Sequence, residues 1–486
     1  MFGKLRCFAL IYPPRFFGRD FSKLGERACY MSVPMGLFGI SDLLEKEGFS
    51  AKILNIPLEM YVNKNWKLED FLEDVRAKIY AISLHWILGS YGAIETARTC
   101  KRIDPSAKIV FGGFSASYFD LEILKQFPFV DYIVRGDGEI PIVELARMLS
   151  GALPMNKVSN LTFRRGKEIV RTPTSYIPNS IDRTSFAKLE FLFHWREFLK
   201  FMRKNMGLPF SVAVGRGCPF NCPFCGGGRK ATEIIASRET VVLRNIEKVV
   251  EDIKILVKIA DVESIYFGHG TYPQNISYWR KLFLTLKEEK INVGADLEIW
   301  RLPVDRAFVE EFSKTFDPTS SSLSFVTYPR KVRALLGPLT DPLLNYDEKD
   351  FQTLVDEATS KDISLRLWFT IGNPFETIKD TFENIESMAK ALSANERERG
   401  HVTFFNTPVT ISPGSPAFEN PWKFGVRLES SSFLYFYDLF KKSRFILGEV
   451  DNPINYSTQY LSKRAIRFWN EVLATAAIPF FAATSH

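Results

Sequence analysis

Three cysteines stand close together near the middle of the chain, in the stretch "GRGCPFNCPFCGGG" over residues 215–228. Cys218, Cys222 and Cys225 have the spacing C-x3-C-x2-C. A structural zinc site needs four ligands, usually from two such pairs, and the sequence has no second cysteine pair. Cys222 and Cys225 could form a redox CxxC, but Cys218 would then have no role. Thiolates also hold iron–sulfur clusters, and three ligands on a four-iron cube leave one iron open.

The residues around these cysteines suit a bulky ligand. Prolines stiffen the loop, and the glycines that follow let the backbone approach closely; these are Pro219, Pro223, Gly226, Gly227 and Gly228. The other cysteines, Cys7, Cys29 and Cys100, stand alone in apolar or helical contexts and are expected to be core thiols.

The overall composition sets limits on the kind of protein. With 486 residues, the chain is expected to form two or three domains. The net charge of +7 is modest, and Lys and Arg are scattered among acidic residues, so nucleic-acid binding is not indicated. The most apolar late stretch, from Val472, is too short to span a bilayer and contains Pro479. The N-terminus reads as a buried strand, so a cytoplasmic location is expected.

The elements that must position the cysteines follow an α/β pattern. Residues 1–150 alternate strand and helix, which predicts a doubly wound, Rossmann-like domain with a parallel sheet. Ligands of such sheets lie beyond the carboxyl ends of the strands, here the loops after Ser83, Phe111 and Arg135.

The rest of the chain divides into three further segments. Residues 151–207 are interpreted as a bridge that contains a hairpin turning at Arg165-Gly166. Residues 208–430 show six βα units, which predicts a partial (β/α)6 barrel with its site at the carboxyl ends of the strands. The cysteine loop follows the first of these strands. Residues 431–486 are aromatic and mostly helical, and are expected to pack over the barrel as a cap.

The cysteine spacing, with Phe224 before the last cysteine and a partial barrel around it, resembles the radical S-adenosylmethionine (SAM) enzymes. The resemblance implies that the three cysteines hold a [4Fe-4S] cluster and that the amino and carboxylate groups of SAM occupy the open iron. An electron from the cluster would then cleave SAM to a 5′-deoxyadenosyl radical that abstracts hydrogen.

The same resemblance suggests several SAM contacts, of which Phe224 is one. In "LWFTIGNPFET" (367–377), Ile371 and Gly372 would lie against adenine. The second strand ends "FGHG", with Gly268 and His269 where the family usually has an acid, and Glu298 on the third strand could supply the carboxylate instead. A loop histidine that is hydrogen-bonded locally is an equally good interpretation of His269.

Two other segments also match the family. "TISPGSPAFEN" (410–420) resembles its Pro-Gly turn after the sixth strand, and Arg238 matches a common arginine.

The first domain resembles the cobalamin-binding domain that precedes the barrel in a large subgroup of that family. The matching segments include "IYAISLHW", "KIVFGGFSAS" and "DYIVRGDGE". The D-x-H-x-x-G motif of many cobalamin proteins is absent, so His85 either approaches cobalt or packs beside the corrin. The resemblance gives as cobalamin-binding candidates Ser83, His85, Trp86, Gly89, Gly112, Gly113, Phe114, Ser115, Gly136, Gly138 and Glu139.

Cobalamin beside a radical generator implies a C-methyltransferase, in which methylcobalamin supplies the methyl group and an unactivated carbon receives it. The substrate would be a protein or peptide side chain or backbone carbon, or a lipid, in a cavity between the domains. The cluster would need an external electron donor, ferredoxin- or flavodoxin-like. The alternative is a cyclase, ring-rearranging or C–C bond-forming enzyme without methyl transfer. A non-catalytic cobalamin or redox sensor is the third hypothesis.

Overall fold

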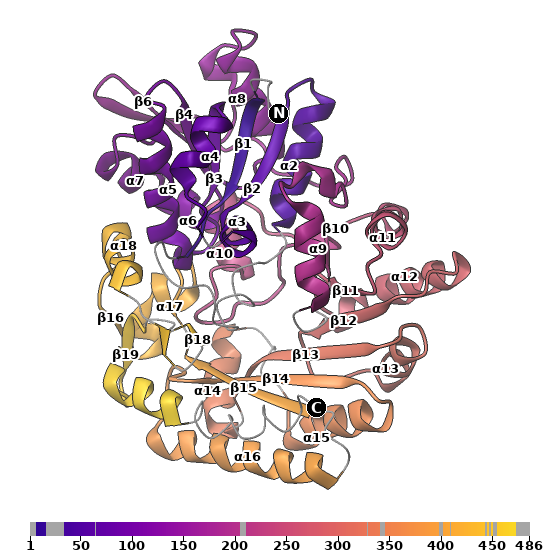
Figure 1. Cartoon of the computed structure of the whole chain (residues 1–486). Helices are drawn as coiled ribbons and strands as arrows, with labels where there is room; N and C mark the ends of the chain where they lie inside the picture. Colours follow the sequence, from indigo (N-terminus) through magenta and orange to yellow (C-terminus); the bar gives the residue numbers. More distant parts are fainter. Residues whose placement is uncertain are drawn as a thin grey trace. The chain divides into compact units, whose positions relative to one another are not determined.

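The computed structural model describes residues 6–15, 34–63, 65–204, 210–327, 329–340, 346–397, 402–408, 410–442, 445–446, 449–450 and 454–472. The chain divides into two compact units (Figure 1). The first unit comprises residues 1–207, 229–243 and 430–451, and the second comprises 208–228, 244–429 and 452–486. The predicted domain bounds stay predictions; these units differ from them in assigning residues 229–243 and 430–451 to the first unit.

The first unit is built on a seven-stranded sheet in the order β2-β1-β3-β4-β5-β6-β7. The first five strands are parallel, and their order is that of a flavodoxin-like doubly wound fold. The predicted N-terminal fold class is therefore confirmed. The strands are β1 (Arg6–Tyr12), β2 (Ala51–Asn55), β3 (Ala77–Ser83), β4 (Lys108–Gly112), β5 (Tyr132–Val134), β6 (Leu161–Arg165) and β7 (Glu168–Arg171).

Helices cover both faces of this sheet, with α2 and α8 on one face and α4 and α5 on the other (Figure 1). Because both faces are covered, the interior strand β1 is a continuous apolar run, and Phe8 to Ile11 are all buried. The helices are α2 (Met35–Lys46), α3 (Ile56–Val62), α4 (Leu68–Asp74), α5 (Ser90–Ile103), α6 (Phe114–Tyr118), α7 (Asp120–Gln126), α8 (Glu139–Leu149), α9 (Trp195–Lys204), α10 (Arg229–Ala236) and α18 (Phe433–Lys442). The short strands β10 (Val242–Leu243), β17 (Phe445–Ile446) and β18 (Glu449–Val450) also belong to this unit.

The hairpin predicted at Arg165-Gly166 is present, but it belongs to the first sheet. Its strands β6 and β7 pair antiparallel, and β6 pairs antiparallel with β5. The edge of the predicted parallel sheet is therefore extended by two antiparallel strands, and this part of residues 151–207 is not a bridge.

Helix α18, in the segment expected to cap the barrel, belongs to the first unit. Its aromatic face is buried against α5 and α7 of the first unit, where the ring of Phe433 lies 5.5 Å from that of Phe119 and 6.0 Å from that of Phe127. The reason is complementarity: Tyr91 of α5, with Phe119 and Phe127 at the two ends of α7, forms an aromatic surface that accepts these rings.

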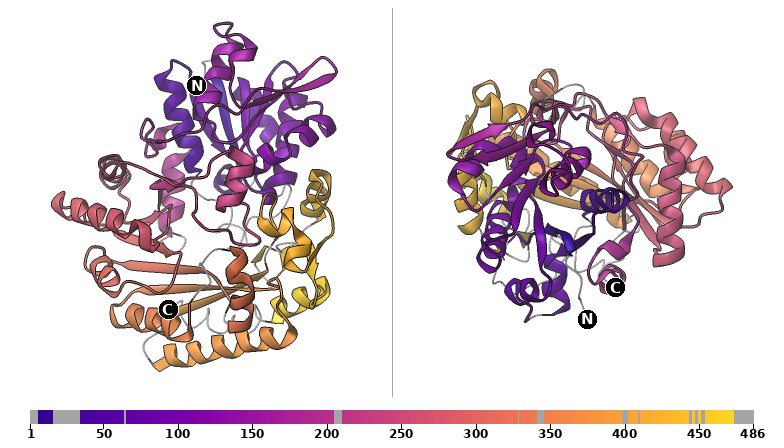
Figure 2. Two further views of the ribbon diagram at one scale, coloured as in Figure 1. Left: turned by 180° about the vertical axis from the view of Figure 1, so that it is seen from behind. Right: turned by 90° about the horizontal axis from the view of Figure 1, so that it is seen from above.

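The second unit contains six parallel strands in the order β15-β14-β13-β12-β11-β8, as a partial (β/α)6 barrel requires (Figure 2). All six predicted strands are present. They are β8 (Phe210–Val212), β11 (Ser264–Phe267), β12 (Gly294–Ile299), β13 (Thr319–Val326), β14 (Ser364–Ile371) and β15 (Val402–Pro408).

Helices alternate with these strands, and the outermost part of the unit is an antiparallel pair of β16 (Val426–Leu428) and β19 (Tyr456–Thr458). The helices are α11 (Ile246–Ala260), α12 (Ile276–Glu288), α13 (Arg306–Ser313), α14 (Arg330–Thr340), α15 (Glu348–Ser360), α16 (Ile378–Arg397) and α17 (Pro416–Glu419), with a further helix over 463–472. The two-residue strand β9 (Gly215–Arg216) precedes the cysteines.

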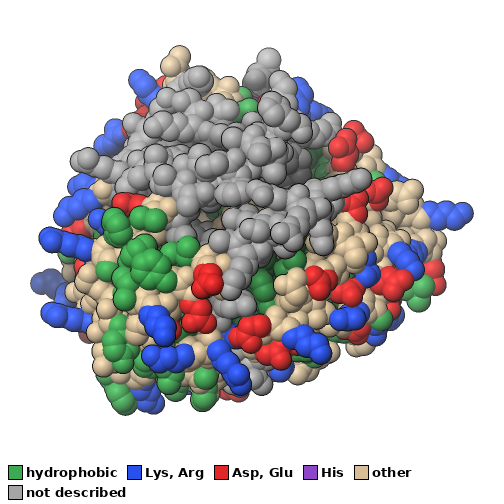
Figure 3. Space-filling view, turned by 90° about the horizontal axis from the view of Figure 1, so that it is seen from below, with side chains coloured by type: hydrophobic (Ala, Val, Ile, Leu, Met, Phe, Trp, Pro, Cys, Tyr) green, Lys and Arg blue, Asp and Glu red, His purple; other side chains and the backbone are tan. Residues whose placement is uncertain are grey.

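The face of the molecule seen from below (Figure 3) has mixed charge on its described residues. On the side chains drawn in colour in Figure 3, Lys and Arg lie interspersed with Asp and Glu, as the composition predicts. Among the residues that the structure describes, every helix is too short or too polar to cross a bilayer. Cys29 and most of the apolar stretch after Val472 lie outside the described residues, and Cys100 is buried as expected.

Candidate cofactor sites

The cysteine loop begins after β8 and is held by backbone hydrogen bonds from the turn that follows β15. Pro223 O accepts from the N–H of Ala417 at 2.8 Å, and Phe224 O accepts from the N–H of Ser412 at 3.0 Å. The turn itself contains Gly414 at φ +80°, a conformation that favours glycine. The predicted Pro-Gly turn thus lies directly against the loop that carries the cysteines.

Burial raises the pKa of all three thiols in this loop, to about 12 for Cys218. The thiols of Cys218 and Cys225 also raise the pKa of Cys222, so the three lie near one another. Desolvated thiols of this kind ionise only when a bound cation compensates the charge. The donor set therefore fits a metal-containing group that displaces the protons.

The thiols do not converge on one point. Across the described ranges of the chain, no group of three His, Cys, Asp or Glu side chains comes close enough together to hold a single metal ion. In a four-iron cube each thiolate holds a different iron, so its sulfurs must lie farther apart than those around one ion.

His269 lies against the cysteine loop, just beyond the end of β11. Its Nε2 lies 3.2 Å from Gly217 O, next to Cys218, and its Nδ1 lies 3.1 Å from Gly270 O. Burial lowers the pKa of His269 to about 4, so the ring is neutral at physiological pH. Gly268 donates its N–H to Val212 O at 2.8 Å and ties this loop to β8. The structure brings Gly268 and His269 to the cysteines, and their contact with SAM stays a prediction.

Glu298 also approaches the cysteine loop. Strand alternation puts Asp296 and Glu298 on one face of β12, and the charge of Glu298 contributes to the raised pKa of Cys218. The carboxylate accepts from Trp300 Nε1 at 2.7 Å and from the hydroxyl of Tyr266. Sequence reasoning missed these two partners; the alternating pattern of β12 could have indicated the inward face.

A partly buried ion pair lies on the same face of the sheet. Arg366 on β14 pairs with Asp296 on β12, across β13. The sequence offered no signal for this pair, because its partners are 70 residues apart.

Ile371 and Gly372, predicted to lie against adenine, sit at the end of β14 beneath the C-terminal segment. Ile371 is buried, and Gly372 O accepts from the hydroxyl of Tyr456 at 2.7 Å. A Cβ on Gly372, which has φ +81°, would lie 2.8 Å from both Tyr456 Oη and Ile466 Cγ2. The described contacts of Gly372 are therefore with protein, and its predicted role stays untested.

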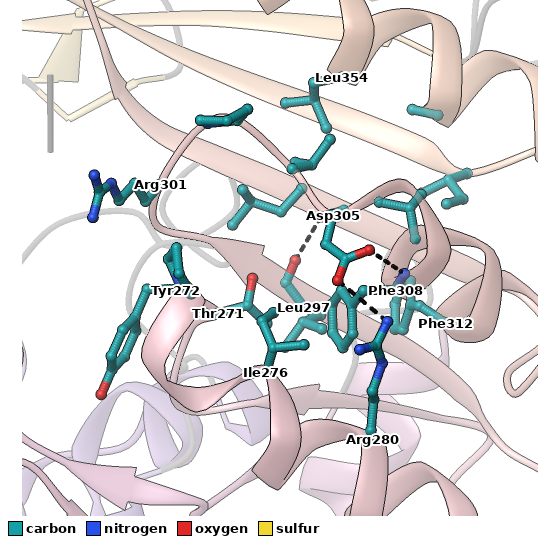
Figure 4. A pocket seen from close by; sticks show the side chains of 18 of the residues that line it. Thr271, Tyr272, Ile276, Arg280, Leu297, Arg301, Asp305, Phe308, Phe312 and Leu354 are labelled. Atoms are coloured by element: carbon teal, nitrogen blue, oxygen red, sulfur yellow. Dashed lines mark hydrogen bonds and ion pairs between the residues drawn. The ribbon is translucent and has the colours of Figure 1, made fainter. Parts of the chain in front are cut away.

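A cavity of about 410 Å³ lies on the opposite face of the sheet (Figure 4). Leu297 and Ile299, which alternate with Glu298 on β12, line it together with apolar side chains of α12, α13 and α15. Arg280 forms ion pairs with Asp305 and Glu311 at its edge. This cavity is separate from the face that carries Glu298, so it is not the predicted SAM site.

In the first unit, glycines allow the loops that carry the candidate cobalamin residues to approach one another closely. Gly113 has φ +108°, and a Cβ there would lie 2.6 Å from the Cα of His85. This close approach lets the N–H of Ser115 donate to His85 O at 2.9 Å, and the Ser115 hydroxyl donates to the same oxygen at 3.1 Å. Gly113 O accepts from the Ser117 hydroxyl, which also accepts the N–H of Gly136. The loops after β3, β4 and β5 form one connected network.

Three aromatic side chains lie above this network. His85 stacks on Phe114 with ring centroids 4.6 Å apart, and Trp86 packs edge-on against both. His85 and Trp86 are exposed, and Trp86 keeps 44% of its surface accessible. An exposed aromatic platform at the carboxyl ends of parallel strands fits a broad, flat ligand such as a corrin.

The other cobalamin candidates lie nearby in the same unit. Ser83 and Gly112 pair at the ends of β3 and β4, Gly89 precedes α5, and Gly138 and Glu139 begin α8. The structure thus gathers all eleven candidates at the carboxyl ends of β3, β4 and β5 and the helix starts that follow. Their cobalamin contacts stay predictions.

Arg238, on the segment that follows the cysteine loop, belongs to the first unit. Its Nε donates to Asp137 Oδ2 at 3.0 Å, and both side chains are almost fully buried. Gly136, at φ +64°, leaves room for Ala236, whose Cα would lie 3.1 Å from a Cβ on Gly136. Asp137 lies in the "RGDGE" segment among the cobalamin candidates, but sequence reasoning did not predict this partner for Arg238.

Comparison with known proteins agrees with both units. The B12 binding domain family matches residues 24–146. A protein of Pyrococcus horikoshii named as an uncharacterized methyltransferase is 24% identical over 42% of this chain and 42% of its own length. The anaerobic magnesium-protoporphyrin IX monomethyl ester cyclase of Cereibacter sphaeroides is 28% identical over 71% of this chain and 54% of its own. The cobalamin-dependent radical SAM methyltransferase TokK of Streptomyces tokunonensis is 23% identical over 61% and 43%. The matches thus span about half or less of these relatives.

Solved structures share the fold. The radical SAM methyltransferase TsrM of Kitasatospora setae superposes with a TM-score of 0.65 at 15% identity, over 88% of this chain and 79% of its own. The cobalamin-dependent SAM radical enzyme OxsB gives a TM-score of 0.68 at 12% identity, over 97% and 66%.

A B12 binding domain followed by a partial barrel with a three-cysteine loop defines a class of cobalamin- and SAM-dependent proteins. Residues 24–146 match the B12 binding domain family, and the chain as a whole is similar to proteins named as cobalamin-dependent radical SAM enzymes, such as TokK and OxsB.

Proposed function

We propose that this protein is a cobalamin-dependent radical SAM C-methyltransferase. The observation that carries the proposal is the three-cysteine loop at the carboxyl end of the first barrel strand, in one chain with a B12 binding domain. When bound, a [4Fe-4S] cluster with SAM supplies a hydrogen-abstracting radical, and cobalamin supplies the methyl group.

The chain's own residues have distinct tasks in this proposal. Cys218, Cys222 and Cys225 hold the cluster, and the desolvation that raises their pKa also excludes water from it. Glu298 offers a carboxylate beside Cys218 for the SAM amino group, and neutral His269 fixes the Gly217 carbonyl. The platform of His85, Trp86 and Phe114 supports the corrin, with the glycine loops carrying its edge. An external electron donor, ferredoxin- or flavodoxin-like, would reduce the cluster.

A second candidate function keeps both cofactors without methyl transfer. The relative from Cereibacter sphaeroides, named as a cyclase, aligns with 71% of this chain. Other relatives are named as a hopanoid C-3 methylase and as a cytidylyl-2-hydroxyethylphosphonate methyltransferase. Methyl transfer is favoured because most of the named relatives are methyltransferases. The substrate class we propose is a peptide or protein carbon, or a lipid.

The test uses anaerobically reconstituted protein, SAM labelled in its methyl group, and anaerobic cell extract separated afterwards into protein, lipid and small-molecule fractions. The expected result is label in one fraction together with 5′-deoxyadenosine, both absent for Cys222→Ala. Formation of 5′-deoxyadenosine without label transfer would support the cyclase. Neither product above the Cys222→Ala level would refute both enzyme functions.

A further inference from the structure

Asn455, at the junction with β19, binds the turn that contacts the cysteine loop. Its side chain is fully buried. Nδ2 donates to Ile411 O at 3.0 Å, and Oδ1 accepts the N–H of Ile411 at 3.0 Å. Its backbone oxygen accepts the N–H of Glu429 at 3.0 Å, which fixes Asn455 itself. One amide thus clamps both backbone groups of a single residue.

The clamped residue adjoins the hydrogen bonds that hold the cysteines. Ser412, the next residue, donates its N–H to Phe224 O at 3.0 Å, and Phe224 precedes Cys225. The cysteine loop contains no long helix or strand, so its carbonyl groups need partners from elsewhere. The connection from Asn455 to Cys225 therefore runs through Ile411, Ser412 and Phe224, across 230 residues of sequence.

We propose that Asn455 is a positioning residue for the cysteine loop and, through it, for the third cluster ligand. The neighbouring Tyr456 binds a different part of the barrel, since its hydroxyl donates to Gly372 O at the end of β14. The two adjacent residues thus have separable roles: Asn455 holds the cluster loop, and Tyr456 holds the strand end predicted to contact adenine. The part of this proposal that concerns the iron–sulfur cluster rests on the proposed function. The part that concerns the position of Cys225 does not.

The chain offers a matched control in the first unit. Asn160 is also fully buried, and its Nδ2 donates to Tyr176 O at 2.9 Å while its Oδ1 accepts the N–H of Tyr176 at 3.0 Å. It has the same clamp geometry but no contact with the cysteine loop. Aspartate at either position keeps the side-chain shape and the acceptor for the backbone N–H. It replaces the Nδ2 donor with a carboxylate oxygen, which repels the backbone carbonyl oxygen.

The experiment compares Asn455→Asp, Asn160→Asp and Tyr456→Phe in the full-length chain. The first readout is the alkylation rate of Cys225 in metal-free protein, measured by mass spectrometry of the cysteine peptide. The second is the rate at which reconstituted protein loses iron to a chelator. Asn455→Asp should raise both rates about tenfold, the effect of losing one or two buried hydrogen bonds. Both other variants should stay within about twofold of the wild type.

Equal changes in Asn455→Asp and Asn160→Asp, or an unchanged Cys225 rate in Asn455→Asp, would overturn the proposal. If Asn455→Asp does not fold, the milder Asn455→Ser supplies the same comparison. Wild-type protein that takes up no iron would refute the proposed function, whereas the alkylation rates would still decide the role of Asn455.

Discussion

The two candidate cofactor regions are built by opposite means. In the second unit, the cysteine loop is held by polar contacts from segments remote in sequence, including the turn after β15 and the segment at β19. In the first unit, the cobalamin candidates are arranged by missing side chains, most clearly at Gly113. The cysteine loop of the second unit should therefore fail when a ligand or hydrogen bond is removed, and the cobalamin candidates of the first unit when atoms are added.

The largest effect is expected from Cys222→Ala. Three thiolates are the minimum set for a cluster with one open iron, so loss of one should lower bound iron after reconstitution to the background level. The glycine loops of the first unit share no residue with the cysteine loop, so cobalamin retained on gel filtration should stay within about twofold. Iron analysis and corrin absorption on the same sample provide the measurement. Iron at the wild-type level would contradict the assigned ligand.

The opposite result, loss of cobalamin binding with iron retained, is expected from Gly113→Ala. Gly113 has φ +108°, a region essentially restricted to glycine, and the added Cβ would lie 2.6 Å from the backbone of His85. We expect cobalamin affinity to fall at least about tenfold, which corresponds to about 1.4 kcal/mol, with iron content unchanged. Equilibrium titration with cobalamin measures this.

Gly89→Ala is the control for backbone strain, compared by melting temperature, which Gly113→Ala should lower. Gly89 has φ −86°, and a Cβ there would meet nothing within 4 Å, so the substitution should leave the melting temperature unchanged. An equal loss of melting temperature in both glycine variants would show that the close approach at Gly113 has no special role.

The comparison also explains what the sequence could predict. The cysteine spacing and the glycine loops are local patterns. The first indicates thiolate ligands within one loop, and the second indicates loops in which the backbone must approach another group closely. Strand and helix periodicity predicted both sheets for the same reason.

What the sequence could not predict depends on pairing between remote segments. The packing of α18 on the first unit depends on which aromatic surfaces meet. The aromatic pattern of a helix does not by itself identify the surface on which the helix packs. The sequence does not distinguish Asn455 and Arg238 from other polar residues, because their roles depend on their partners, Ile411 and Asp137, in the folded chain. The antiparallel hairpin was visible in the sequence, but its attachment to β5 was not.

Two buried ion pairs, one in each unit, sharpen the comparison. Arg238 pairs with Asp137 in the first unit at 3.0 Å, and Arg244 pairs with Asp252 in the second at 2.8 Å. All four side chains are almost fully buried. Removal of one partner leaves an uncompensated buried charge, which costs about 3–5 kcal/mol.

Arg238→Ala should therefore destabilise the first unit, although Arg238 follows Cys225 by only 13 residues. Hydrogen exchange resolved by peptide should show faster exchange in β4, β5 and α6 for Arg238→Ala, and in β8 and α11 for Arg244→Ala. Faster exchange of the second-unit peptides in Arg238→Ala would contradict the assignment of residues 229–243 to the first unit.

The smallest expected effect concerns Glu376, in the turn after Gly372. Burial raises the pKa of this carboxyl to about 7, although it accepts hydrogen bonds from Asn373 and Thr381. The folded state therefore binds the proton more tightly than the unfolded chain, whose pKa is near 4.5. Stability that is complete below about pH 4.5 is lost as the pH rises to 7, by on the order of 1–3 kcal/mol.

Glu376→Gln should remove this pH dependence, because the amide oxygen still accepts from Asn373 and the amide group can donate to the Thr381 hydroxyl. Melting temperatures of metal-free protein at pH 5 and pH 8 provide the test, and the fall between them should be smaller by a few degrees in the variant. An unchanged fall in Glu376→Gln would mean that the carboxyl is already ionised in the folded protein, and that the turn beside Gly372 tolerates a buried charge.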